Sequence, residues 1–401
     1  MESLFIARQP IYNSEQTVIG YELLYRNDDV DHAVFEDGNQ ASYETIINTF
    51  MHIGIDNLIG SALAFINMPY EFVVNESLTP MFKEQVVLEI LEDIEPTSEV
   101  IGGIQRLKSQ GYKIALDDFN YDDKYIPFLQ MADYVKIDIQ NRSENNIREL
   151  VNQLVNYDAL IIAEKVETQE MLTLCQNCGL EYFQGFYFCK PQLVKQKHIP
   201  ANKAVALNLL NKLQNPDIEF ETLESILAQD VALSYKFLRY INSAAFSLRR
   251  EIDSIKDAIA LLGIKNTRNW VSMLLMSKTG ENKPDELISI ALIRGKMCEL
   301  MAEKIQPEIR NQMFIVGLFS VLDALMDMEM IDLLDTIILS SPIKMALLDH
   351  AGDHGKILDY VLLYEQFQWD KILKTGIKPS VFTDAYLEAV EWGKTQIAAI
   401  N

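Results

Sequence analysis

The sequence predicts an α/β barrel followed by an all-helical domain, and two contrasting patterns support this. In the first half of the 401-residue chain, short apolar runs typical of strands alternate with amphipathic helical stretches or turns. After Asn202 the strand-like runs stop, and apolar residues recur at the three- and four-residue spacing of helices. The change follows the proline-containing stretch FCKPQLVKQKHIP, so the predicted domains span residues 1–200 and 201–401.

Seven strand-like runs in the first half carry a polar residue at or just past their C-terminal end. The runs are TVIGYELL, ALAFIN, VVLEI, KIALDD, ADYVKID, ALIIAEK and EYFQG, and their polar residues are Glu22, Asn67, Glu89, Asp117, Lys136, Glu164 and Gln184. Parallel strands deliver such side chains to the C-terminal rim of a β/α barrel, where its active site forms. Solvated strand ends are the alternative, but a series of acids joined by one Asn and one Lys favours a site.

The second half predicts helices at residues 206–213, 223–242, 252–263, 267–276, 286–305 and 313–326. The last of these is the most apolar run of the chain. It is shorter than the roughly 20 residues that a membrane span needs, and Asp323 interrupts it. We therefore expect a buried helix there and no membrane association.

Composition limits the classes of function. Hydrophobic residues make up 49% and charged residues 23%, as in an ordinary globular protein. The net charge of −23 argues against binding nucleic acid or an anionic membrane, because both require clustered Lys and Arg. The N-terminus has no long apolar core, which predicts a cytoplasmic protein. The four cysteines, two of them in Cys175-Gln-Asn-Cys178, are expected to be structural.

The polar strand ends suggest a metal site. Carboxylates and an Asn carbonyl are hard oxygen ligands that favour Mg²⁺ or Mn²⁺ over zinc. Asp117 and Asp118 are adjacent and could serve two ions, which at a separation of about 4 Å clamp the attacking and leaving oxygens of a phosphodiester. Lys136 would supply a fixed positive charge, and Glu164 would accept the proton of the attacking water. Metal-assisted phosphodiester hydrolysis is the resulting hypothesis.

A barrel enzyme of the enolase type remains an alternative on residue chemistry alone, because its carboxylates also hold Mg²⁺ while a Lys abstracts a carbon-bound proton. Exchange of a substrate α-proton, without product from phosphodiesters, would favour that reading.

The motifs of the first half resemble those of EAL domains, the bacterial phosphodiesterases that open cyclic di-GMP to pGpG with Mg²⁺ or Mn²⁺. YELLYR at 21–26 is similar to the family's EAL signature, with Glu22 and Arg26 kept. The further segments FINMP, LEILE, ALDDF, KID, AEKVET and FQGFYFCKP follow in the family's order. Together these motifs are highly specific for the family.

The resemblance implies a role for each matching residue. The metal ligands would be Glu22, Asn67, Glu89, Asp117 and Glu164, with Asp118 as a contact of the second metal or of water. Catalysis would involve Glu164, Lys136 and Asp118, substrate binding Arg26 and Gln184, and support Glu92 and Glu167.

Two departures from the family pattern bear on turnover. EAL enzymes usually follow the paired aspartates with a glycine-containing loop, DDFGTG, that positions the second metal and links subunits, whereas this chain reads DDFNYDD. Glycine accepts positive φ without strain, and Asn120 tolerates it better than most residues. Lys165 also replaces a glycine beside Glu164. The ligand set is therefore complete, while the loop that arranges it is altered.

The second half resembles an HDOD domain, a helical relative of the HD phosphohydrolases, over residues 226–246 and 254–263. HD hydrolases carry a metal-binding His-Asp pair where this chain has Ser320 and Val321. Asp349-His350 and His354 lie downstream and are expected to belong to a loop or a cap. The resemblance thus implies a regulatory or partner-binding module.

The leading hypothesis is a cytoplasmic cyclic di-GMP phosphodiesterase that binds two Mg²⁺ or Mn²⁺ ions. Its HDOD domain would bind an unknown protein partner, and a homodimer is compatible with the family. The alternative is a catalytically silent EAL domain that acts as a nucleotide receptor or as an adaptor, and the DDFNYDD loop is its main support.

Overall fold

The computed structural model describes residues 4–27, 55–75, 83–185, 201–215, 218–228, 231–242, 252–279 and 285–400. The chain forms two compact units, Met1–Phe188 with Glu365–Thr383 and Cys189–Tyr364 with Asp384–Asn401. The predicted boundary at residue 200 falls outside the described residues and stays a prediction. The grouping of Glu365–Thr383 with the first unit has no counterpart in the sequence pattern.

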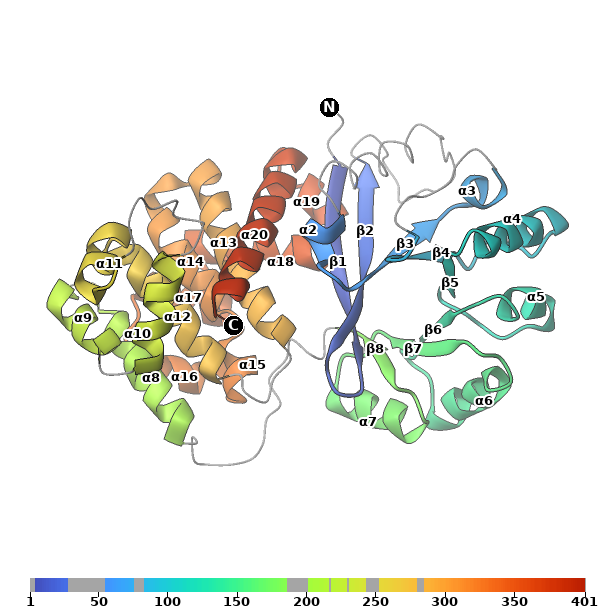
Figure 1. The fold of residues 1–401 in the computed structure, drawn as a ribbon, viewed down its shortest axis with the longest axis horizontal. Coiled ribbons are helices and arrows are strands. Elements are labelled where there is room, and N and C mark those ends of the chain that lie inside the picture. The colour runs from blue at the N-terminus through green and yellow to red at the C-terminus, as the bar shows by residue number, and fades with distance from the viewer. Residues whose placement is uncertain are drawn as a thin grey trace. The chain divides into compact units, whose positions relative to one another are not determined.

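The first unit contains a closed barrel of eight strands in sequence order (Figure 1). The strands are β1 (Leu4–Asn13), β2 (Val18–Asn27), β3 (Leu63–Met68), β4 (Val86–Ile90), β5 (Lys113–Leu116), β6 (Tyr134–Asp138), β7 (Leu160–Glu164) and β8 (Tyr182–Gln184). The predicted barrel is confirmed, and all seven expected runs form strands. β1 is an additional strand that the strand-end pattern did not predict.

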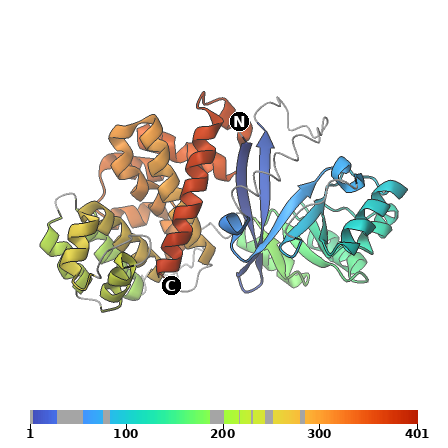
Figure 2. The same ribbon diagram turned by 45° about the horizontal axis from the view of Figure 1, so that its top comes forward.

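β1 runs antiparallel to both of its neighbours, whereas the pairs from β2 to β8 are parallel. The connection from β1 to β2 is a short turn in which Asn13 Oδ1 accepts hydrogen bonds from the backbone N–H groups of Glu15 and Thr17. Gln16 has a φ of 61° in this turn. A turn this short joins only antiparallel strands, which accounts for the direction of β1. Figure 2 shows β1 and β2 side by side as a long hairpin.

The described helices of the first unit follow its strands. They are α2 (Ile55–Ile59), α3 (Tyr70–Val74), α4 (Ser98–Ser109), η2 (Asp123–Tyr125), α5 (Ile126–Leu129), α6 (Glu144–Leu154) and α7 (Gln169–Asn177). Thr97, Ser143 and Thr168 each accept a hydrogen bond from a backbone N–H three residues later, which satisfies a donor that the first helical turn leaves open. The same unit includes α19 (Trp369–Leu373).

An apolar layer fills the inside of the barrel below the polar residues of the rim. It contains Phe65, Val87, Ala115, Tyr134 and Ile162. Two residues further along the same chain segments lie Asn67, Glu89, Asp117, Lys136 and Glu164. Side chains two positions apart in a strand point to the same face, so the polar residues form a second inward layer directly above the apolar one. The strand period thus places the candidate site on a closed hydrophobic floor.

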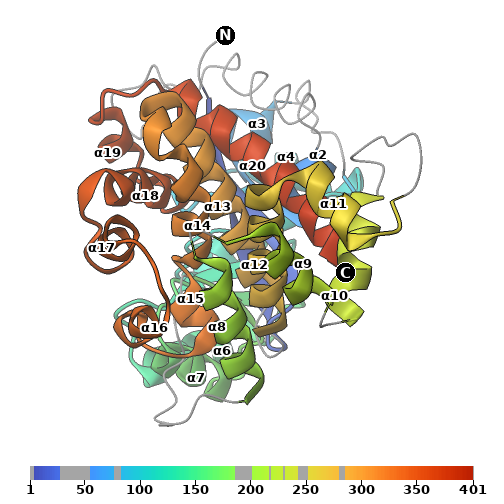
Figure 3. The same cartoon turned by 90° about the vertical axis from the view of Figure 1, so that its left-hand side faces the viewer.

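The second unit is helical, as predicted (Figure 3). Its helices are α8 (Ala201–Leu213), α9 (Phe220–Ala228), α10 (Val231–Ile241), α11 (Ile255–Leu262), α12 (Ile264–Thr279), α13 (Asp285–Ile305), η5 (Pro307–Ile309), α14 (Arg310–Phe319), α15 (Leu322–Met326), α16 (Met330–Thr336), α17 (Ser341–Asp349), α18 (Gly352–Glu365) and most of α20 (Pro379–Ile400). The helices α13 and α14 pack so closely that a Cβ at Gly317 would lie 2.5 Å from the Arg294 carbonyl oxygen.

The predicted buried helix at residues 313–326 is divided into α14 and α15, with Ser320 as the C-cap of α14. By length and composition, Pro307–Met326 would suffice to cross a membrane, but 67% of this window is buried inside the structure. This burial is typical of a core helix in a helical domain.

Candidate active site at the rim of the barrel

Lys136 occupies the centre of the polar layer. Its ammonium nitrogen lies 2.9–3.0 Å from one oxygen each of four carboxylates, namely Glu22, Glu89, Asp117 and Glu164. These acids come from β2, β4, the residue after β5, and β7, so barrel closure alone brings them together. Both Lys136 and Glu89 have 0% exposure. A charge this deeply buried needs counter-charges, which explains why the acids gather on the ammonium.

One ammonium group cannot balance the negative charge of four carboxylates, and this affects the pKa of each acid. Burial raises the pKa of Glu164 to about 8, although Lys136 acts in the opposite direction. Burial also raises the pKa of Glu89 well above its usual value and, to a smaller extent, that of Asp117. For Lys136, burial alone would lower the pKa, but the surrounding carboxylates raise it well above the usual value. The metal-free site therefore keeps a charged Lys136, and Glu164 is largely protonated near neutral pH.

Glu22 is the exception among these acids because it receives further hydrogen bonds. Gln184 Nε2 donates to Glu22 Oε2 at 2.6 Å, and Asn67 Nδ2 lies 3.5 Å from Glu22 Oε1. Burial opposes ionisation of Glu22, but Lys136 and the bonds from Gln184 and Asn67 outweigh it and lower its pKa. Gln184 also donates to Gln9 Oε1 at 3.0 Å, which ties it to β1. Glu22 is therefore held in its charged form.

A second charge cluster lies beside the first, at the mouth of the barrel. Lys165 Nζ lies 2.5 Å from Asp138 Oδ2 and 3.7 Å from Asp118 Oδ2. Lys165 has a φ of 57° and Asp118 a φ of 42°, both in the left-handed region that favours glycine. The altered loop is tied to its neighbours by the contact of Arg142 Nη2 with Asn120 Oδ1 at 2.5 Å. The ammonium group of Lys165 therefore places a positive charge of the chain itself next to Asp118.

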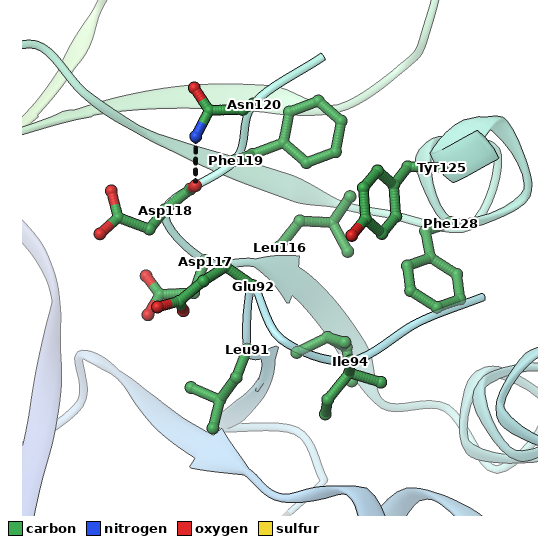
Figure 4. A pocket seen from close by; sticks show the side chains of 11 residues that line it. Leu91, Glu92, Ile94, Leu116, Asp117, Asp118, Phe119, Asn120, Tyr125 and Phe128 are labelled. Atoms are coloured by element: carbon green, nitrogen blue, oxygen red, sulfur yellow. Dashed lines mark hydrogen bonds between the residues drawn. The ribbon is translucent and has the colours of Figure 1, made fainter. Parts of the chain in front are cut away.

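A cavity of about 250 Å³ opens beside these acids. Figure 4 shows the carboxylates of Glu92, Asp117 and Asp118 gathered on one side of it and the rings of Tyr125 and Phe128 on the other. The two rings lie 5.9 Å apart between centroids. The cavity therefore offers an acidic wall and an aromatic wall to a ligand.

The structure brings together most of the residues that the sequence singled out. Those in contact around Lys136 and Glu22 are Glu22, Asn67, Glu89, Asp117, Lys136, Glu164 and Gln184. Asp118 stands apart with Lys165. Glu92 is exposed on the cavity wall, and Glu167 lies past the end of β7 and is partly buried. Arg26 belongs to β2, but its side chain lies outside the described part of the chain.

The sequence did not single out Gln9 or Asp138, and it marked Lys165 only as a residue that replaces a glycine of the family pattern. The signal for Asp138 was present, because it ends the KID segment two residues after Lys136 and therefore faces the same way. For Gln9 there was none, since its role depends on the pairing of β1 with β8.

The donor set fits a hard divalent cation. Carboxylate and amide oxygens converge from several strands, and Glu89 Oε2 and Gln184 Oε1 are buried without a hydrogen-bond partner among the described residues. Within those same residues, no group of three His, Cys, Asp or Glu side chains has the arrangement of a ready metal site. The acids are directed to the Lys136 ammonium instead, so metal binding would require them to reorient.

The second unit uses its polar residues structurally. Ser320 accepts a hydrogen bond from Arg294 Nη1 at 2.8 Å and donates to the Gly317 carbonyl at 2.7 Å. His350 is the C-cap of α17, which confirms the expectation of a cap, and its ring contacts Asp359. His354 lies 2.5 Å from Gln312 Oε1. Cys175 and Cys178 are buried at the end of α7 and free, as expected of structural cysteines.

The fold and its two parts define a two-domain EAL–HDOD protein. The EAL domain family model matches residues 76–191, and the HDOD domain family model matches residues 199–332. Cyclic di-GMP phosphodiesterase CdgJ of Vibrio cholerae is 32% identical over 98% of this chain and 93% of its own length. The uncharacterized protein YuxH of Bacillus subtilis is 32% identical over 97% of this chain and 98% of its own length. The chain belongs to this EAL–HDOD family.

Among solved structures, an EAL domain protein from Listeria monocytogenes EGD-e is 23% identical. The match covers 46% of this chain and 87% of that one, with a TM-score of 0.37.

Proposed function

We propose that this protein is a metal-dependent phosphodiesterase that opens cyclic di-GMP to pGpG. The observation that carries the proposal is the cluster of four carboxylates on Lys136 at the inner rim of the barrel. A relative that aligns with nearly the whole chain is named a cyclic di-GMP phosphodiesterase, which supports this substrate. Localisation in the cytoplasm is part of the same proposal.

Mg²⁺ or Mn²⁺ would be held by oxygens of Glu22, Asn67, Glu89, Asp117 and Glu164. When bound, such a cation would polarise the phosphodiester and lower the pKa of the attacking water. Support comes from the buried, unpaired Glu89 Oε2 and from Glu89 and Glu164, whose pKa is raised by burial and would be lowered again by a bound cation. A second ion would lie toward Asp118, where Lys165 competes for the same carboxylate.

The chain's own residues would carry the proton and charge changes. As the water oxygen bonds to phosphorus and the bond to the 3′ oxygen breaks, Glu164 accepts the water's proton and the leaving 3′ oxygen takes up a proton from solvent. Lys136 keeps its positive charge throughout and stabilises the negative charge that develops at phosphorus. Gln184 holds Glu22 in place through its 2.6 Å hydrogen bond. Arg26 is proposed to contact a substrate phosphate.

The cavity beside Asp117 and Asp118 would take one planar guanine of the substrate. Its aromatic wall, formed in part by Tyr125 and Phe128, suits stacking, while its acidic wall suits the N–H edge of guanine. Glu92 on the acidic wall would assist in this recognition.

The silent receptor or adaptor is a second candidate, and Lys165 favours it. A lysine stands in a left-handed position, and its ammonium engages Asp118 and Asp138. A cation supplied by the chain could hold the rim in a form that binds nucleotide without turnover.

The proposal is tested by incubating the full chain with cyclic di-GMP and either Mn²⁺ or Mg²⁺ and separating the products by chromatography. We expect pGpG from the wild type and a loss of roughly 100-fold or more in Glu22→Gln, because one ligand and its charge are removed. Glu144→Gln, which alters an exposed carboxylate of α6, is the matched control and should retain full activity.

Absence of pGpG from the wild type with both metals would reject the hydrolase. Calorimetry with cyclic di-GMP would then separate a receptor, which binds the nucleotide, from an adaptor, which does not.

The helical unit is proposed to be a regulatory or partner-binding module. Ser320 caps α14 and supports Arg294, a structural use that agrees with a domain lacking a catalytic His-Asp pair. Ser320→Ala should leave hydrolysis unchanged, and a large loss would point to a site in this unit.

A further inference from the structure

The helical unit contains a cavity of about 220 Å³ that none of the residues discussed for catalysis line. It lies between helices α10, α11, α12, α13, α14 and α20. Its lining is Tyr240, Leu262, Asn266, Asn269, Trp270, Met273, Lys296, Glu299, Phe314, Trp392 and Gln396. Asn266 and Leu262 are exposed or partly exposed, whereas Asn269, Trp270 and Gln396 are buried. The cavity therefore has a mouth at the start of α12 and a buried floor.

Aromatic rings form much of its wall. Tyr240 and Trp270 are stacked, with centroids 5.3 Å apart and planes at 20°. Phe314 and Trp392 meet edge to face at 5.6 Å. Aromatic walls of this kind favour a flat ligand, because offset stacking and edge contacts both add to the burial of its area.

Three buried polar atoms at this cavity have no hydrogen-bond partner among the described residues. They are Asn269 Oδ1, Gln396 Oε1 and Trp270 Nε1, on side chains that are 8%, 3% and 3% exposed. An unsatisfied buried donor or acceptor costs about 1–3 kcal/mol, so three around one cavity need a reason. Two acceptors and one donor are matched by a ligand that carries N–H groups and an acceptor on one planar frame.

The charged side chains of the cavity are engaged with one another. Glu299 lies 3.2 Å from both Lys296 Nζ and Lys265 Nζ. Burial opposes ionisation of Glu299, but Lys296 and Lys265 outweigh it and lower its pKa. An uncharged ligand leaves these ion pairs intact, whereas a phosphate would compete with Glu299 for the two lysines.

We propose that this cavity binds a purine as the free base or nucleoside, at a second site separate from the barrel. A purine is flat, uncharged, of a size that a cavity of 220 Å³ holds, and presents ring and amino N–H donors beside ring acceptors. Ordered water is the competing occupant, since it can also satisfy buried polar atoms. Only a purine would stack on the aromatic walls and change tryptophan fluorescence, so an experiment can distinguish a purine from water.

The protein carries its own reporters for the test. Two of its three tryptophans, Trp270 and Trp392, line the cavity, and the third, Trp369, does not. Titrating the full chain with guanosine and with adenosine, with excitation at the red edge of tryptophan absorption, should give saturable quenching. Trp369→Phe and Glu22→Gln should quench equally, which keeps this test independent of the barrel.

Asn269→Leu should weaken purine binding at least tenfold and raise the melting temperature, because it removes a polar atom that only the ligand satisfies. Gln396→Met provides the same test if Asn269→Leu does not fold. Asn208→Leu, at an exposed position of α8, is the matched control and should bind as the wild type does.

Two results would overturn the proposal. One is the lack of saturable quenching by either nucleoside up to millimolar concentration, which would leave water as the occupant. The other is unchanged binding in both Asn269→Leu and Gln396→Met.

Discussion

The ammonium of Lys165 lies 3.7 Å from Asp118 Oδ2, and both residues have a left-handed backbone. Asp118 lies just past the end of β5 and Lys165 just past the end of β7, so two bends turn an acid and a cation toward each other. A non-glycine residue in this conformation costs roughly 1–2 kcal/mol. Lys165 would therefore compete with the second metal ion that is proposed to bind at Asp118.

Removing the Lys165 charge should strengthen cation binding near Asp118. We expect both Lys165→Asn and Lys165→Gly to tighten the weaker Mn²⁺ site by roughly tenfold, because one nearby positive charge is lost. Calorimetric titration of Mn²⁺ in the absence of nucleotide measures this. Tighter Mn²⁺ binding in Lys165→Gly but not in Lys165→Asn would assign the effect to the backbone instead of the charge. Both variants remove the charge, but only glycine adopts a left-handed φ without strain. No gain in either variant would mean that Lys165 does not compete with metal.

Lys136→Met should destabilise the metal-free protein by about 3–5 kcal/mol at pH 8, because buried carboxylates lose their only close cation within the described cluster. Urea unfolding in the presence of a chelator measures the change. The loss should shrink at pH 5, because Glu164 is protonated well below its pKa of about 8 and then needs no cation. Arg148→Met, which breaks an exposed pair on α6, is the control and should leave unfolding unchanged. A loss that does not depend on pH would indicate a packing defect.

Glu164 should make the metal-free protein less stable as pH rises. Its folded pKa of about 8 exceeds its ordinary value of 4.5, so folding favours the protonated acid. The associated stabilisation is complete below pH 4.5 and is lost as pH rises through about 8. Glu164→Gln cannot ionise, so its melting temperature should fall less than that of the wild type between pH 5 and pH 8.5. Parallel curves for the two proteins would contradict the raised pKa, and Glu144→Gln should follow the wild type.

Two adjacent glycines of α4 should respond oppositely to alanine. A Cβ at Gly103 would lie 2.1 Å from the Val73 carbonyl oxygen, whereas a Cβ at Gly102 would meet nothing within 4 Å. We expect Gly103→Ala to destabilise the barrel by several kcal/mol or to prevent folding. Gly102→Ala should stabilise it by about 0.5–1 kcal/mol through helix propensity. Denaturant unfolding of both variants decides this, and equal effects would refute the close approach of α3 and α4.

Much of the barrel could be predicted because its signals are local. The apolar runs, their two-residue period and the polar residues at their ends are all visible along the chain, as Val87 with Glu89 and Ile162 with Glu164 illustrate. β1 was missed because its sequence, LFIARQPIYN, is not an apolar run that ends in a polar rim residue. Its antiparallel direction follows from the short turn at Asn13–Thr17, which is a matter of backbone geometry.

The sequence by itself determined a barrel followed by a helical domain, the family, and the residue types at the rim, because hydrophobic period and motif order are properties of neighbouring residues. Only the tertiary structure decided that Lys136 lies at the centre of four acids, that Lys165 reaches Asp118, and that Asn269 and Gln396 share a cavity with two tryptophans. Those relationships join residues far apart in the chain, and they depend on barrel closure and helix packing, which no local pattern encodes.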